Sequence, residues 1–104
     1  MLGVNATDGA TLSTRAILLA KLGRQTEALE ASGRAVAAAP GDALVLYERA
    51  VVHAILGDEP AALEQLREAL ASGYPAPDVL QDDEWQTFEG RPWFRKLVPP
   101  GNGR

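Results

Sequence analysis

Few side chains in this chain of 104 residues could carry catalytic or metal chemistry. There is no cysteine, so disulfides, thiolate metal sites and cysteine nucleophiles are excluded. The single histidine, His53, falls inside a predicted helix and could be a general base, but no second histidine could share a metal with it. We interpret His53 as a packing residue between paired helices. Because the serines and threonines accompany neither a glycine-rich elbow nor a phosphate-binding loop, we predict no enzyme activity, no cofactor and no metal.

The longest acidic run is Asp82-Asp83-Glu84. Three adjacent carboxylates could bind a divalent cation, but neighbours on a helical turn point in different directions, and no glycine-punctuated loop resembles a calcium site. The alternative is that the run begins a helix, where negative charge lies against the positive end of the helix dipole. We predict this second role.

The composition is rich in alanine and mildly acidic. Much of the 46% hydrophobic content is alanine, which has the highest helix propensity, and no segment alternates as a strand would. The formal charge of −4 makes nucleic acid and anionic lipid poor partners. The most apolar N-terminal stretch, residues 17–20, is too short for a signal peptide or a membrane span. These features predict an all-helical, cytoplasmic protein that binds neither nucleic acid nor membrane.

The chain contains an internal repeat with a period of 34 residues. Residues 12–39 and 46–73 are identical at 11 of 28 positions without a gap, and the identities include Gly23 and Gly57. A fixed period of this length is typical of stacked supersecondary units, here pairs of helices.

Helix start and stop signals divide each unit in two. We expect helices over residues 11–22, 26–39, 43–56 and 59–72. Gly23 and Gly57 follow the first helix of each pair. A helix often ends at a residue in the left-handed backbone conformation, which glycine adopts without steric cost because it has no side chain. Asp42 and Asp58 are good N-caps for the third and fourth helices, and Pro60 is harmless in a first turn.

This pattern resembles the tetratricopeptide repeat. The matching positions are an apolar residue, a small residue and a turn glycine around the first helix, small residues on the second, and a closing proline: Leu12/Leu46, Ala16/Ala50, Gly23/Gly57, Ala28/Ala62, Ala35/Ala69 and Pro40. Arg15 and Arg49 depart from the family pattern, which usually has leucine there. The resemblance covers residues 9–98 and implies an α-solenoid of antiparallel helix hairpins.

The same resemblance predicts the domain organisation. A single domain over residues 10–98 would contain one repeat over 10–41, a second over 43–75 and a C-terminal helical cap over 77–98. Residues 1–9 would form an N-terminal arm and 99–104 a flexible tail. The cap resembles the closing segment of bacterial tetratricopeptide arrays, although Asp83 stands where that segment usually has proline. Its aromatic side chains could cover the last repeat; they are Trp85, Phe88, Trp93 and Phe94.

The helix predicted over residues 43–56 carries two apolar faces. Leu46, Ala50 and His53 form its expected packing face. A second line follows at helical spacing and comprises Leu44, Tyr47, Val51 and Ile55. The first helix of each pair lines the concave, peptide-binding face in this family, so the resemblance implies a site along this line, with Lys21 and Glu48 at its rim. The alternative is that the line packs against a neighbouring helix or under the cap.

We therefore predict a non-catalytic scaffold that binds a protein or peptide on the concave face of its repeats. The predicted binding residues are Lys21, Leu44, Tyr47, Glu48, Val51 and Ile55. The positions that hold a terminal carboxylate in chaperone-tail receptors are here occupied by Ser13, Ile17, Tyr47 and Val51, so that carboxylate clamp is missing.

Two further hypotheses concern partners. Closing segments of this kind resemble the ends of bacterial kinases and transcriptional regulators, so the alternative function is a regulatory or sensory C-terminal fragment of such a signalling protein. Because about three repeat units are normally needed to bury their apolar faces, we also expect the outer face of the N-terminal helix to dock on a second copy, a partner subunit or an upstream domain.

Overall fold

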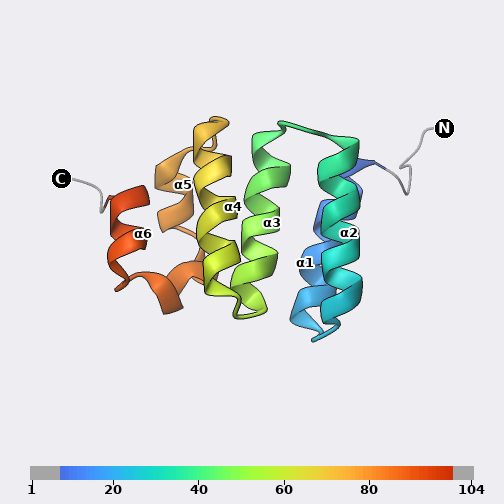
Figure 1. Cartoon of the computed structure of the whole chain (residues 1–104), viewed down its shortest axis with the longest axis horizontal. Coiled ribbons are helices and arrows are strands. Elements are labelled where there is room, and N and C mark those ends of the chain that lie inside the picture. Colours follow the sequence, from blue (N-terminus) through green and yellow to red (C-terminus); the bar gives the residue numbers. More distant parts are fainter. Residues whose placement is uncertain (1–7, 100–104) are drawn as a thin grey trace.

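The computed structural model describes residues 8–99. Every regular element in this part of the chain is a helix, so the predicted all-α class is confirmed. The elements are α1 (Gly9–Lys21), α2 (Gln25–Ala38), α3 (Ala43–Ile55), α4 (Glu59–Ala71), α5 (Ala76–Leu80), the 3₁₀ helix η1 (Asp83–Phe88) and α6 (Pro92–Leu97). They follow one another along an elongated molecule of 46 × 26 × 18 Å, with α1 and α2 at one end and α6 at the other (Figure 1). None of the described helices is long and apolar enough to cross a membrane.

The helix boundaries follow from local capping chemistry. Asp42 and Asp58 precede α3 and α4. The Asp42 side chain accepts the backbone N–H groups of Leu44 and Val45, and the Asp58 side chain accepts that of Ala61. Gly23 and Gly57 follow α1 and α3 with φ of 78° and 82°. A Cβ at either position would meet no neighbour within 4 Å, so the backbone conformation, not lack of space, requires glycine. These predicted start and stop signals are confirmed.

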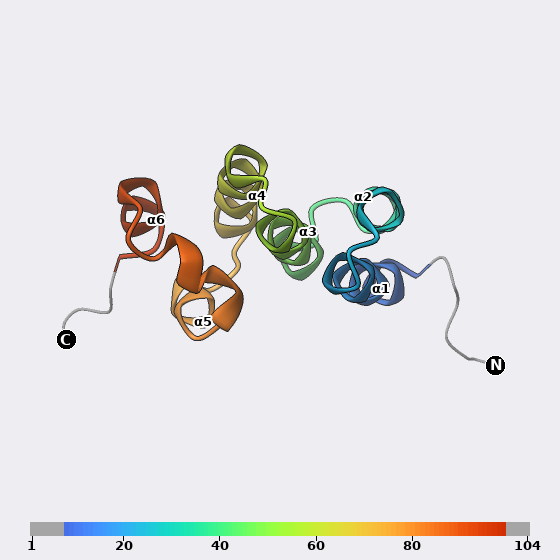
Figure 2. The same ribbon diagram turned by 90° about the horizontal axis from the view of Figure 1, so that it is seen from below.

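The four long helices pack in two pairs. α1 lies along α2 and α3 along α4, and α3 also contacts both α1 and α2 (Figure 2). Ala16 and Ala28 are fully buried, as are their counterparts 34 positions later, Ala50 and Ala62. Short side chains let helix axes approach closely at these contacts. These matched alanines therefore have the same buried environment in the two pairs.

The C-terminal segments pack against α3 and α4. Trp85, Phe88 and Phe94 are buried in one apolar cluster with Leu66 of α4. The Trp85 ring centroid lies 6.2 Å from that of Phe88 and 5.9 Å from that of Phe94, and Trp93 packs on the edge of the cluster. The prediction that these aromatic side chains cover the last helix pair is confirmed.

The helix bounds refine two of the predicted segments. Helix α1 begins at Gly9, because the Asp8 side chain caps it by accepting the backbone N–H of Thr11 at 3.1 Å, so the predicted arm over residues 1–9 is too long at its C-terminal end. The predicted cap over residues 77–98 consists of three short helices, separated where Asp82 and Arg91 begin new helices. Residues 1–7 and 100–104 lie outside the described part of the chain.

Candidate functional site

The apolar line predicted along α3 divides between packing and exposure. Tyr47 and Val51 are only 4% and 3% exposed, whereas Leu44 is 49% exposed. Ile55 packs between the cluster around α1 and α2 and the cluster around α4 and the cap. For Tyr47, Val51 and Ile55 the packing alternative is therefore correct, because neighbouring helices and the C-terminal segments cover them. Only Leu44 presents a large apolar surface.

Tyr47 is the central buried polar group of this region. Its hydroxyl accepts a hydrogen bond from the indole N–H of Trp85 at 2.9 Å and donates one to Asp82 at 2.5 Å. Its ring stacks on Tyr74, with ring centroids 4.0 Å apart and planes 5° from parallel. Burial, and then the hydrogen bond to Asp82, raise the pKa of Tyr47 far above its ordinary value. Tyr47 therefore stays neutral and anchors the C-terminal segments on α3.

The acidic run beside Tyr47 has the structural role that was predicted for it. Asp82 is the N-cap of η1, with its Oδ1 accepting the backbone N–H of Glu84 at 3.0 Å. The other carboxylate oxygen accepts the Tyr47 hydroxyl. Within residues 8–99 no group of three or more His, Cys, Asp or Glu side chains could hold a metal ion.

A hollow of about 320 Å³ lies between the last turns of α1, the exposed side of α3 and the start of η1. It is lined by Ile17, Lys21, Leu44, Tyr47, Glu48, Val51, Tyr74, Asp82 and Glu84. Five of the six predicted site residues are thus brought together. The sixth, Ile55, does not line the hollow, because it is used in packing between the two clusters.

The remaining lining residues were not predicted as part of a site. Ile17 was noted only as a mismatch to the carboxylate clamp, and Asp82 and Glu84 only as a helix start. Tyr74 follows α4, where the repeat decays. No periodicity of the sequence links these positions to α3. They join the hollow through tertiary contacts, such as the stacking of Tyr74 on Tyr47, which no sequence pattern indicates.

The charge around the hollow is predominantly negative. The Lys21 ammonium lies 3.1 Å from the Glu84 carboxylate and bridges α1 to η1. Glu48, Asp82 and Glu84 supply three carboxylates against this one lysine, which leaves two negative charges. Tyr74 lies within this field: partial burial, followed by the charges of Asp78, Asp82 and Glu48, raises the pKa of its hydroxyl. The hollow is therefore suited to a ligand that carries positive charge.

His53 lies outside this hollow. Its side chain is largely buried, and its Nδ1 has no hydrogen-bond partner among the described residues, with the nearest carboxylate oxygen, on Asp58, 4.0 Å away. Burial, with a smaller effect of the Arg49 charge, lowers the pKa of His53. A half-buried, neutral imidazole between helices fits the packing role that was predicted.

Comparisons with protein-family models, with curated proteins and with solved structures found no match. The hollow is defined by its own lining: the exposed Leu44, the stacked rings of Tyr47 and Tyr74, and an excess of carboxylates over lysine.

Proposed function

We propose that this chain is a non-catalytic, cytoplasmic interaction module of the tetratricopeptide-repeat kind, which binds a peptide or protein segment in the hollow between α1, α3 and η1. In this proposal α1–α2 and α3–α4 are two stacked hairpins of a short α-solenoid, and α5, η1 and α6 are its closing cap. The 34-residue period supports it, since matched alanines are buried in both pairs and matched glycines have the same left-handed conformation.

The observation that carries the binding proposal is the combination of apolar surface and negative charge in one hollow. Leu44 is the exposed large apolar residue of this hollow, and the Tyr74 ring is part of the same lining. Glu48, on the next turn of α3 from Leu44, is partly exposed and makes no ion pair with a described residue. A partner segment that places an apolar side chain on Leu44 and a lysine or arginine near Glu48 would satisfy both.

The hollow is also held in shape before any ligand binds. Its floor is the Tyr47 side chain, which is fixed by two hydrogen bonds and by stacking on Tyr74. The Lys21–Glu84 ion pair closes one side. A preorganised site loses little conformational entropy on binding, which favours recognition of short segments.

The test is a selection of short random-sequence peptides on the intact chain, followed by affinity measurements on the enriched peptides by fluorescence anisotropy. We expect lysine or arginine next to apolar residues to be enriched. Glu48→Lys should weaken binding about tenfold, because it replaces an attraction at a partly exposed site with a repulsion. Leu44→Asp should weaken binding further, since it places a charge against the apolar side chain of the peptide.

Glu68→Lys is the matched control. It makes the same charge change at an exposed position of α4, away from the hollow, and should leave the affinity unchanged. Enrichment without basic residues, or equal effects of the two lysine variants, would contradict the proposal. Tyr47 and Val51 are unsuitable for this test because both are buried, so their substitution would disturb the fold itself.

A further inference from the structure

Helix α1 has an exposed apolar face at the end of the molecule away from α3. Leu18 is 58% exposed and Leu22 71% exposed. A shallow hollow next to Leu18 is lined by Ala10, Thr11, Thr14 and Arg15 as well. We call this surface, together with the adjoining groove between α1 and α2, the end face.

The repeat indicates that the end face is a packing surface. The counterparts of Leu18 and Leu22, 34 positions later on and after α3, are Val52 and Leu56. Val52 is fully buried against α1 and α2, and Leu56 packs on the same cluster. The side of α1 that carries Leu18 therefore corresponds to the side of α3 that packs on the preceding helix pair. On α1 this side has no partner among the described residues.

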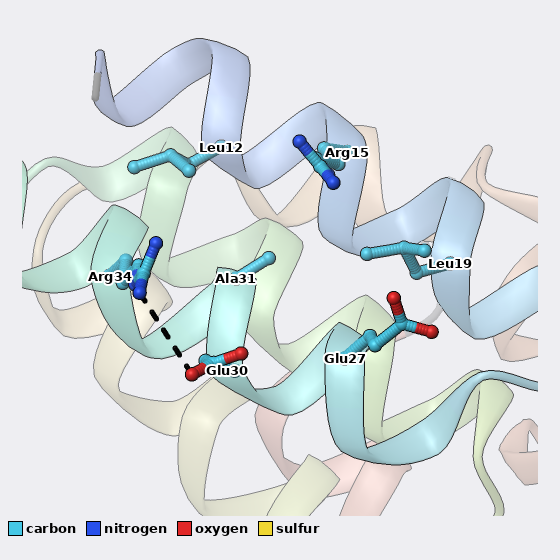
Figure 3. A pocket seen from close by; sticks show the side chains of 7 residues that line it. All are labelled: Leu12, Arg15, Leu19, Glu27, Glu30, Ala31 and Arg34. Atoms are coloured by element: carbon cyan, nitrogen blue, oxygen red, sulfur yellow. Dashed lines mark ion pairs between the residues drawn. The ribbon is translucent and has the colours of Figure 1, made fainter. Parts of the chain in front are cut away.

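The groove between α1 and α2 belongs to the same end of the molecule. It encloses a hollow of about 120 Å³, and Figure 3 shows the side chains of the two helices facing each other across it. Apolar side chains line it from both helices, namely Leu12, Leu19 and Ala31. Its charged rim consists of Arg15, Arg34, Glu27 and Glu30. The volume is about that of four water-sized groups, which is enough for the end of a leucine side chain.

The charges of the rim are arranged in a self-complementary way. Its α1 side carries Arg15, which makes no ion pair with a described residue. Its α2 side carries Glu27, Glu30 and Arg34, which leaves one negative charge. The two glutamates pair only with exposed arginines, Glu27 with Arg24 before α2 and Glu30 with Arg34. A two-fold axis that lays α1 of one copy across α2 of the other brings Arg15 of each copy to the two glutamates of its partner.

We propose that two copies of this chain pair through the end face. Leu18 of each copy packs into the groove between α1 and α2 of the other, and Arg15 lies against Glu27 and Glu30 of the other copy. The opposite end of the molecule is covered by the aromatic cluster around Trp85, so the contact is isologous and closes as a dimer instead of extending as a filament. This pairing is independent of peptide binding in the other hollow.

Light scattering coupled to size exclusion tests the pairing on the intact chain. We expect a mass twice the 11.1 kDa of one chain. Leu18→Asp should weaken the dimer by roughly a hundredfold or more, because each substitution counts twice in a two-fold interface. Leu44→Asp is the matched control: it places the same charge at another exposed leucine and should leave the dimer intact. A wild-type chain of single mass at every concentration, or a Leu18→Asp variant that remains dimeric, would overturn the proposal.

Charge exchange tests the register. Arg15→Glu alone and Glu27→Arg/Glu30→Arg alone should each give a monomer, because like charges then meet twice. Mixed together, the two variants should recover a heterodimer, since one original and one reversed set of ion pairs then form. Circular dichroism should show that both variants keep their helicity. A mixture that stays monomeric, or variants that dimerise alone as well as the wild type, would show that these charges do not face each other.

Discussion

Replacing Tyr47 by phenylalanine removes one oxygen atom from the contact that holds the C-terminal segments on α3. That oxygen is the acceptor for the Trp85 indole N–H and the donor to Asp82. Trp85 is fully buried, so its N–H would have no access to water. A buried donor left without an acceptor costs about 1–3 kcal/mol. The Asp82 carboxylate is partly exposed and can be hydrated instead, so it adds less.

We therefore expect Tyr47→Phe to lower the free energy of unfolding by about 2 kcal/mol. For a domain of about this size, that corresponds to a fall in Tm of about 8–16 °C. Urea unfolding followed by circular dichroism measures the change, with an unaltered denaturant dependence as the check that both states keep their compactness.

Tyr74→Phe is the matched control. It removes the same atom from the ring that stacks on Tyr47, but the Tyr74 hydroxyl makes no hydrogen bond with a described residue, so stability should change by less than about 0.5 kcal/mol. In a Trp85→Phe background no indole N–H remains, and the cost of Tyr47→Phe should shrink by about 1 kcal/mol or more. Equal effects of the two tyrosine substitutions, or additive effects with Trp85→Phe, would refute the reasoning.

Three other substitutions test the backbone and the pH dependence of stability. Gly57→Ala, at a φ of 82°, should destabilise the chain by about 1 kcal/mol. Gly33→Ala, inside α2 with space for a methyl group, should instead stabilise it by about 0.5–1 kcal/mol. Thermal unfolding compares the two variants, and a change of Tm in the same direction for both would contradict a conformational requirement for glycine at position 57 only. The lowered pKa of His53 means that the unfolded chain takes up its proton first as the pH falls. The free energy of unfolding should therefore fall as the pH drops below 6.5, the ordinary pKa of histidine. In His53→Gln this fall should be absent from urea titrations between neutral and mildly acidic pH. An unchanged dependence of the free energy of unfolding on pH in this variant would count against the role of His53.

The helices and their ends were predictable because their signals are local. An aspartate that caps a helix and a glycine that ends one act within a few residues, so Asp42, Asp58, Gly23 and Gly57 could be assigned from neighbouring residues alone. The packing alanines were predictable for a second reason: the repeat presents each contact twice, which distinguishes a required small residue from a chance one.

The site was predictable only in part. Helical spacing placed Leu44, Tyr47, Glu48 and Val51 on one side of α3, and all four do line the hollow. Spacing along one helix cannot determine how deeply a neighbour covers each turn. The burial of Tyr47 and Val51 depends on segments that begin more than twenty residues later, for which the repeat provides no template.

The sequence by itself determined the all-α class, the four long helices, the aspartate caps of α3 and α4, and the absence of thiol chemistry, because each depends on residue type and short-range order. Only the tertiary structure decided that Asp82 serves both as the N-cap of η1 and as the acceptor for Tyr47, that Tyr74 stacks on the same ring, and that Leu18 stays exposed where its counterpart Val52 is buried. These are contacts between residues distant along the chain. Their geometry depends on how whole helices dock, which no local pattern specifies.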